Sequence, residues 1–347
     1  MRILVAMSGG VDSSVAAALL VDGGHEVVGA TMKLWGGTGD SGCCSVADVT
    51  DARRVCDRLG IDHHVFNFTE AFNEMVVDPY VEAHRRGETP NPCVECNRHL
   101  KFDAFIARAK RLGFDSVATG HHARVERDEV GRSQLVRGHD RAKDQSYVLS
   151  ILGSDQLDFL LLPVGTMEKS QVRALAEQRG LITFAKPDSQ DVCFIASRTK
   201  GLGRAQFLGE RIELHPARVV ESATGTEHGE VAAVELVTIG QRRGLPTDSS
   251  MRPRYVIDVD VDKRVVTVGD REELMVLGLR LSNRTWVHEP RGSGTRVLVQ
   301  MSAHGAAQKA TLDVEGLTFD EPSRKIARGQ IVALYEDHRV VGSGVVC

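Results

Sequence analysis

The chain has 347 residues, and at roughly 100–200 residues per domain this length predicts two or three domains. Hydrophobic residues make up 42% and charged residues 26%, close to the values of soluble globular proteins, which excludes a disordered or collagen-like chain. The net charge of −4 means that a nucleic-acid surface would need local clusters of cations. No apolar run approaches the ~20 residues of a membrane span and no signal peptide opens the chain, so we expect a cytoplasmic protein with no membrane partner.

The first 120 residues alternate short apolar runs with helical patterns. We expect strands at residues 2–7, 26–32, 65–68 and 116–119, and helices over the apolar stretch 15–21 and over 45–59, 71–86 and 99–112. Ser45 suits a helix N-cap and Gly60 a helix end. Strands that alternate with helices are typical of a parallel sheet covered on both faces, so we predict an α/β domain over residues 1–200.

The pattern changes in the second half of the chain. We expect a hairpin over residues 123–137 with Gly131 in its turn, then helical segments at 144–161 and 168–179. After residue 200 the β-branched runs 231–239, 254–261, 264–268, 295–301 and 331–335 are separated by Gly, Pro and Asp. We therefore predict two small, mainly β modules: a central β-rich domain at 201–277 and a C-terminal β-barrel domain at 278–347.

A Gly-rich turn joins the first strand to the first helix. The turn has the sequence Ser8-Gly9-Gly10-Val11-Asp12-Ser13-Ser14. Its glycines allow a ligand to approach the backbone closely, and the helix start offers unpaired N–H groups, so the turn suits a phosphate. The turn has neither the Gly-Lys-Ser/Thr of a Walker A loop nor the G-x-G-x-x-G of a dinucleotide site. It resembles the loop of the PP-loop pyrophosphatases, which implies that ATP, with Mg²⁺, is cleaved between its α and β phosphates while an oxygen is adenylated.

The seven cysteines form an odd and sparse set, unlike the framework of a disulfide-rich scaffold. Cys93-Val94-Glu95-Cys96 precedes the helix expected at 99, where a helix N-terminus favours a thiolate, so Cys96 is a candidate nucleophile. Cys193 lies in a polar loop and could meet Cys96 above the sheet. Three other interpretations stay open. The C-x-x-C could be half of a zinc site or a redox motif, and Cys193 could be a small buried hydrophobic residue. We expect the remaining cysteines to be structural: Cys43, Cys44, Cys56 and Cys347.

Further motifs extend this pattern along nearly the whole chain. In order they are Thr89-Pro90-Asn91-Pro92, Cys96-Asn97, Lys101-Phe102, Thr119-Gly120-His121, Lys143-Asp144-Gln145-Ser146-Tyr147, Cys193-Phe194-Ile195, the run from Thr238 to Leu245, Phe319-Asp320-Glu321-Pro322 and Gly329-Gln330. With these motifs in register the sequence is similar to the tRNA-specific 2-thiouridylases. The resemblance implies an ATP-dependent sulfurtransferase that thiolates C2 of the wobble uridine, U34, in tRNAs for Lys, Glu and Gln.

The resemblance also assigns roles to individual residues. It implies ATP binding by Ala6, Met7, Ser8, Gly9, Gly10, Val11, Asp12, Ser13, Met32 and Gly120, and tRNA contact by His121, Lys143, Asp144, Gln145 and Gln330. Cys193 would carry a persulfide from a sulfur donor, and Cys96 would be the nucleophile. The reaction would leave a Cys96–Cys193 disulfide for a reductant to reopen.

The chain departs from the family pattern at two places. At the position of Cys93 many relatives carry an Asp to which general acid/base catalysis is usually assigned. Cys93 is therefore a candidate accessory residue of the active site. Together with Cys96 and Cys193 it could instead ligate a [4Fe–4S] cluster that activates sulfide, a second route to the same product. Three apolar residues, Val297-Leu298-Val299, stand where some relatives show Arg and Tyr, which argues against phosphate contacts there.

Two other functions stay open at the level of sequence. One is a PP-loop ligase that forms an amide or guanidino group on a small molecule and needs no paired cysteines. The other is a non-catalytic tRNA-binding or sulfur-carrier protein. For tRNA binding, the segment 85–111 holds seven cations against three acidic residues, a local charge of +4 beside Cys96.

Overall fold

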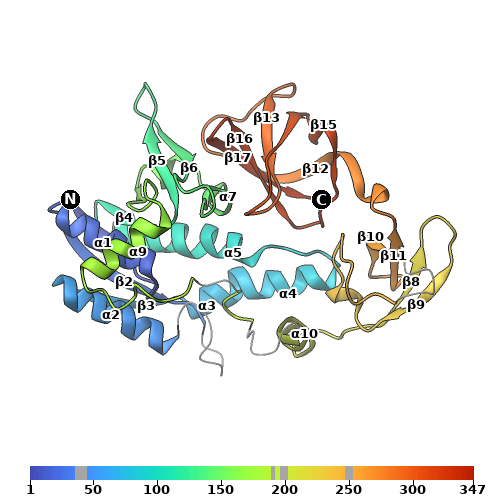
Figure 1. The fold of residues 1–347 in the computed structure, drawn as a ribbon, viewed down its shortest axis with the longest axis horizontal. Helices are drawn as coiled ribbons and strands as arrows, with labels where there is room; N and C mark the ends of the chain where they lie inside the picture. The colour runs from blue at the N-terminus through green and yellow to red at the C-terminus, as the bar shows by residue number, and fades with distance from the viewer. Residues whose placement is uncertain (36–44, 189–191, 196–201, 247–252) are drawn as a thin grey trace.

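The fold was obtained as a computed structural model, which describes residues 1–35, 45–188, 192–195, 202–246 and 253–347 (Figure 1). Cys43, Cys44 and the residues 189–191 next to Cys193 lie outside these ranges. None of the helices in the described ranges is long and apolar enough to cross a membrane.

The N-terminal domain is built on a five-stranded parallel sheet in the order β3-β2-β1-β4-β7. Its strands are β1 (Arg2–Ala6), β2 (Glu26–Lys33), β3 (His63–Asn67), β4 (Ser116–Ala118) and β7 (Leu160–Leu161). Side chains of β1 alternate between two cores, as the period of a strand requires. Ile3 and Val5 pack in one core, Leu4 and Ala6 in the other. The expected α/β domain with a doubly covered parallel sheet is confirmed.

Helices cover both faces of this sheet. One core contains residues of α1 (Val11–Asp22), α2 (Val46–Leu59) and α9 (Lys169–Gln178). The other contains residues of α3 (Thr69–Phe72), the π-helix η1 (Asn73–Val77), α4 (Asp78–Arg85), α5 (Pro92–Glu95), the π-helix η2 (Cys96–Ala104) and α6 (Phe105–Arg111). Helix α2 has the predicted ends: Ser45 and Asp48 form a capping box, and Gly60 closes the helix at φ 69°.

Three expected elements are wrong in extent or type. The helix expected at 99–112 begins earlier, at Pro92, because Asn91 caps it, so the C-x-x-C lies inside the helix. The helix expected at 144–161 consists of two single turns, α7 (Ser146–Leu149) and α8 (Ser154–Leu157), followed by strand β7, since extended Gly153 separates the turns. The strand expected over 231–239 does not form: strand β9 (Glu227–Val231) ends at Val231, and the next apolar residues form a 3-10 turn, η3 (Val234–Leu236).

The remainder of the chain forms two β modules, as expected. A four-stranded sheet in the order β10-β11-β8-β9 follows the single helix α10 (Leu202–Gly209). Its strands are β8 (Ala217–Glu221), β9 (Glu227–Val231), β10 (Tyr255–Asp260) and β11 (Val265–Gly269), and the 3-10 turn η4 (Glu272–Leu274) comes next. Six strands then form a barrel that the β12–β17 pairing closes: β12 (Met275–Trp286), β13 (Arg296–Gln300), β14 (Gln308–Leu312), β15 (Gly316–Arg324), β16 (Ile331–Glu336) and β17 (Arg339–Val346).

The barrel is attached to the N-terminal domain by a shared sheet. The hairpin β5 (Ala123–Arg127) and β6 (Ser133–Arg137) has the predicted extent, and β6 pairs with barrel strand β17. In Figure 1 the hairpin stands beside the barrel, above the parallel sheet. Strand β12 runs across residue 277, and the division into 1–200, 201–277 and 278–347 stays a prediction.

Candidate active site

The Gly-rich turn of residues 8–14, which we call the phosphate loop, lies between β1 and α1, as predicted, and is shaped by contacts among its own residues. Ser13 Oγ accepts from Ser8 N at 3.2 Å and donates to the Gly10 carbonyl at 3.1 Å. Gly9 has φ +70°, and a Cβ there would collide with the backbone of Asp48. Gly120 approaches α1 equally closely, because its Cβ would lie 2.5 Å from Ser13 N. Both glycines are therefore needed for the loop to fit against α2 and the end of β4.

Asp12, in the first turn of α1, is held by two basic side chains. Lys169 Nζ lies 2.7 Å from each Asp12 carboxylate oxygen, and His122 Nε2 lies 3.0 Å from one of them. Burial alone would raise the pKa of Asp12, but these partners outweigh it and lower the pKa below its usual value. Asp12 is therefore an ionised carboxylate at neutral pH.

A second carboxylate, Asp188, connects the same lysine to the segment that leads to Cys193. Its oxygens accept from Lys143 Nζ at 2.9 Å and Arg173 at 2.8 Å, and they lie 2.9 Å from Lys169 Nζ. Burial works against ionisation, but Lys143 and Lys169 bring the pKa of Asp188 to about 2. Lys169 thus joins the phosphate loop to the residues preceding Cys193.

The same segment is also fixed to α2. Lys186 Nζ lies 2.7 Å from both Asp48 and Asp51, and Arg173 donates to the Lys186 carbonyl at 2.8 Å. Beyond the gap at 189–191, Phe194 is buried among aromatic rings, with centroids 5.1 Å from Phe207 and 5.5 Å from Tyr80. These anchors on both sides determine where Cys193 lies.

The C-x-x-C occupies the start of the long helical run α5–η2–α6. Asn91 caps the run by accepting from Cys93 N at 3.1 Å, and the π-helix η2 begins at Cys96. Cys93 is exposed, whereas Cys96 is buried. From the sequence we expected Cys96 at the N-terminus of the helix. The structure places Cys93 there, and Cys96 lies about one turn further along the helix. A π-helical turn at this point is typical of functional sites.

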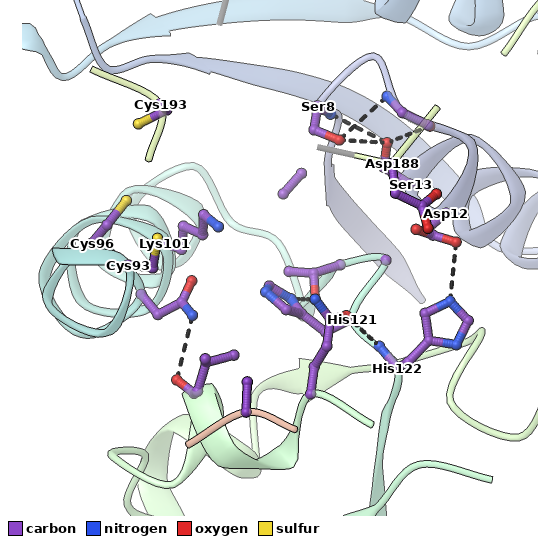
Figure 2. Close-up of a pocket in the computed structure, with 18 of the residues that line it drawn as sticks. Ser8, Asp12, Ser13, Cys93, Cys96, Lys101, His121, His122, Asp188 and Cys193 are labelled. Atoms are coloured by element: carbon purple, nitrogen blue, oxygen red, sulfur yellow. Dashed lines mark hydrogen bonds and ion pairs between the residues drawn. The ribbon is translucent and has the colours of Figure 1, made fainter. Parts of the chain in front are cut away.

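One cavity of about 930 Å³ brings these groups together. Among the sequence-predicted residues, those that line it are Ala6, Met7, Ser8, Gly10, Val11, Asp12, Ser13, Met32, Cys93, Cys96, Gly120, His121, Lys143, Asp144, Gln145 and Cys193. Figure 2 shows the three cysteines on one side and Ser8, Asp12 and Ser13 on the other, with His121 and His122 below. The described cysteines, Cys56, Cys93, Cys96, Cys193 and Cys347, are not disulfide-bonded.

Two predicted residues are not among those that line this cavity. Gly9 faces the backbone of Asp48 instead. Gln330 lies in the barrel, where its side chain donates to the Thr89 carbonyl just before the C-x-x-C helix. Gln330 therefore contacts the segment that leads into the C-x-x-C helix and not the cavity wall.

The predicted tRNA residues next to the cavity are themselves engaged with protein. Asp144 accepts from Arg137 at 2.9 Å and from the backbone of Gly138 and Ser146, and Gln145 accepts from His122 N at 2.8 Å. His121 accepts or donates a 2.8 Å hydrogen bond with Thr119. Burial, with Lys101 nearby, lowers the pKa of His121 to about 3, so its imidazole is neutral at pH 7.

The geometry also tests whether a metal cluster fits. In the described part of the chain, no three or more His, Cys, Asp or Glu side chains are grouped closely enough to hold a metal ion. Cys93, Cys96 and Cys193 line the same cavity but do not form such a group, and we derive no step through a [4Fe–4S] cluster.

Several lining residues were not identified from the sequence: Asp48, His122, Lys169, Lys186 and His304. They come from α2, the β4–β5 connection, the first turn of α9, the segment before Cys193 and a barrel loop. Single lysines and aspartates at element ends look like ordinary surface residues, so only the fold reveals them.

Comparisons with known proteins agree with the site. Family models match residues 1–197 (tRNA methyl transferase HUP domain), 205–270 (tRNA methyl transferase PRC-barrel domain) and 276–346 (Aminomethyltransferase beta-barrel domain). A tRNA-specific 2-thiouridylase MnmA from Mycobacterium leprae is 46% identical, with 100% of this chain and 99% of the relative covered. One from Acidothermus cellulolyticus is 43% identical, with 100% and 97% covered. Among solved structures, the U34-tRNA thiolase NcsA from Methanococcus maripaludis is 16% identical at a TM-score of 0.37 over 60% of this chain and 65% of its own.

Proposed function

The chain belongs to the MnmA family of tRNA-specific 2-thiouridylases, and on this premise we propose that it adenylates the C2 oxygen of U34 and replaces it with sulfur from a persulfide on Cys193. The reaction class follows from family membership: this chain is an ATP-using tRNA-uridine sulfurtransferase. The position of the uridine, the Lys, Glu and Gln tRNAs, a persulfide donor, a reductant and a cytoplasmic location are parts of the proposal.

One observation carries the proposed mechanism: a single cavity is lined by the phosphate loop, Cys96 and Cys193. A uridine carbonyl is a poor electrophile because oxide is a very poor leaving group. Adenylation turns that oxygen into the phosphate of AMP, and the two steps must occur in one place because the adenylated base is reactive. A cavity with a phosphate site opposite two thiols supports this sequence of steps.

The sulfur steps balance with two cysteines. The terminal sulfur of the Cys193 persulfide attacks C2, and AMP departs with the oxygen. The Cys96 thiolate then attacks Cys193 Sγ, which releases 2-thiouridine and leaves a Cys96–Cys193 disulfide. An external reductant opens that disulfide and returns both thiols. None of the cysteines that the structure describes is disulfide-bonded, which is compatible with the reduced resting state.

Magnesium fits the site through Asp12. This ionised carboxylate lines the cavity on the phosphate loop, and Mg²⁺ is usually bound by one or two carboxylates together with substrate phosphates. When bound, the ion would offset the negative charge of the triphosphate. Asp12 would hold it, while the loop backbone and neighbouring cations orient the phosphates.

The rival small-molecule ligase is not favoured. Such an enzyme needs no paired thiols, whereas two cysteines from distant parts of this chain line the cavity opposite the phosphate loop. The full-length match to thiouridylases also disfavours a non-catalytic sulfur carrier.

The test is incubation with ATP, a persulfide sulfur donor and unmodified tRNA, followed by nucleoside analysis. We expect 2-thiouridine and one pyrophosphate per thiolated base from the wild type. Cys193→Ser and Cys96→Ser should both form pyrophosphate but no 2-thiouridine. Thiolation that survives both substitutions would overturn the persulfide mechanism, and absence of 2-thiouridine from the wild type would overturn the function.

A further inference from the structure

The most constrained cation in the cavity is Lys169, the first residue of α9. Its backbone N–H donates to Asp140 at 3.0 Å, which fixes the start of the helix. Its side chain is only 11% exposed and lines the cavity beside the phosphate loop. Burial of a long cation in such a position is costly unless its charge is paired, and here two carboxylates pair it.

The two carboxylates come from different segments of the chain, but both contact Lys169 and both have a further partner. Asp12 belongs to the phosphate loop and Asp188 to the segment before Cys193, and each lies within 2.9 Å of Lys169 Nζ. Each also has another partner: His122 for Asp12, and Lys143 with Arg173 for Asp188. Withdrawal of Lys169 therefore leaves neither carboxylate without a hydrogen-bond donor.

Lys186 could not be withdrawn from its paired carboxylates in the same way. Its two partners, Asp48 and Asp51, both lie on α2, and the carboxylate of Asp48 is otherwise held by the neighbouring Ser45 cap. Removal of Lys186 would leave two carboxylates of one helix side by side without the cation that they share. Of these two lysines, Lys169 is thus the one that a stronger anion could take over at low cost.

We propose that Lys169 binds the phosphates of ATP and that Asp188 is the counter-ion it gives up when the nucleotide arrives. A triphosphate carries more charge than a single carboxylate and accepts charge-assisted hydrogen bonds, so it competes effectively for the ammonium group. Asp188 then keeps Lys143 and Arg173. This assignment rests on the proposed function only in requiring that the chain binds ATP.

The test is calorimetric titration of the full chain with α,β-methylene-ATP, and separately with adenosine, in the absence of tRNA. In Lys169→Gln we expect binding of the ATP analogue to weaken about 10- to 100-fold, the equivalent of one charge-assisted hydrogen bond. Adenosine binding should stay as in the wild type, because the lost contact is to phosphate. Lys169→Arg should recover part of the affinity.

A matched control and a second substitution separate binding from folding. Arg179→Gln, at the C-terminal end of the same helix, removes an ion pair with Asp22 far from the cavity and should leave both affinities unchanged. Asp188→Asn removes the competitor for Lys169 and should tighten binding of the analogue several-fold. That gain should vanish in the Lys169→Gln background if the two residues exchange partners as proposed.

Three results would overturn the assignment. Wild-type affinity of Lys169→Gln for the analogue would exclude phosphate contact, and equal loss of adenosine and analogue would show a purely structural lysine. Equal tightening by Asp188→Asn in both backgrounds would assign the effect to Lys143 or Arg173. Failure of the wild type to bind the analogue would instead count against the proposed function itself.

Discussion

The thiols of this chain lie in very different surroundings. Cys56, in α2, is fully buried against Gly29, where a Cβ would come within 2.5 Å of its sulfur. Burial, with Asp57 nearby, raises the pKa of Cys56 to about 12. Cys93 and Cys347 are exposed, and Cys193 is half-buried. Since the thiolate is the reactive form, these differences should determine which cysteines react.

We therefore predict an order of alkylation in the native protein. With limiting iodoacetamide at pH 8, Cys93 and Cys347 should be modified first, Cys96 more slowly, and Cys56 only after unfolding in urea. Peptide mass spectrometry measures each site separately. Modification of Cys56 at the same rate as Cys347 would contradict the buried environment described here.

Many site residues could be predicted from residue type and order in the sequence, whereas the others could be identified only from their positions in the fold. The glycines and hydroxyls of residues 8–14 are recognisable because few other chemistries need them in that order after a strand. Lys169 and Asp188 were not selected as site residues, because their role depends on a third element, the phosphate loop, more than 150 positions from either in the sequence. A long-range ion pair leaves no local signature in one sequence.

At the scale of elements, helix α4 connects the N-terminal domain to the central module through a buried histidine. His84 is 1% exposed, and its Nδ1 bonds to the Glu235 carbonyl at 3.1 Å. Within the described residues, its Nε2 has no hydrogen-bond partner. Burial lowers the pKa of His84 to about 4, although the Glu235 carbonyl acts in the opposite direction. Protonation would place an unsatisfied charge in this interface.

The linkage predicts acid sensitivity with a definite sign. Between pH 6.5 and 4 the unfolded chain protonates His84 and the folded chain does not, so stability falls as the pH falls. From pH 7 to 5 the wild type should lose as much as about 2 kcal/mol more unfolding free energy than His84→Gln, which keeps a donor for Glu235. Urea denaturation at both pH values checks this, and parallel losses in wild type and variant would contradict it.

Element types were predictable where periodicity and caps agree, as in α2 with Ser45 and Gly60. Predictions of element type failed where tertiary contacts determine the local structure. Residues 231–239 are apolar enough for a strand, but the carboxylate of Glu235 bonds to His215 at 2.8 Å and holds a 3-10 turn. Strand β7 has only two residues, too few for a sequence pattern, and exists because β4 pairs with it.

At the scale of the whole molecule, one arginine connects the barrel to the wall of the candidate active-site cavity. Arg137, at the end of β6, donates to Asp144 at 2.9 Å and to barrel residue Gln300 at 2.7 Å. Its guanidinium also stacks 3.7 Å from the ring centroid of Tyr335. Gln300 in turn donates to the carbonyls of Ser302 and Ala303, and Ala303 lines the cavity.

This arrangement explains how a barrel strand with the apolar stretch Val297-Leu298-Val299 contributes to the site. Val297 and Val299 of β13 are buried in the barrel core, so this strand has little to offer an RNA backbone. The strand instead supplies Gln300, which positions the following loop next to Lys143–Gln145. The barrel thus supports the cavity rim through Arg137, and the expected tRNA contacts depend on that support.

Arg137→Lys should therefore act on tRNA and not on ATP. A lysine keeps the charge but has no planar fork to reach Asp144 and Gln300 together, so we expect the KM for tRNA to rise about tenfold while the KM for ATP stays within a factor of two. Urea denaturation should show a loss of about 1–3 kcal/mol, because one buried acceptor loses its donor. Arg296→Lys is the matched control, since Arg296 pairs with Asp320 on the exposed barrel surface, where such a pair contributes little. An unchanged KM for tRNA in Arg137→Lys, or an equal rise in both constants, would show that the barrel's hold on the cavity rim does not control access of the RNA.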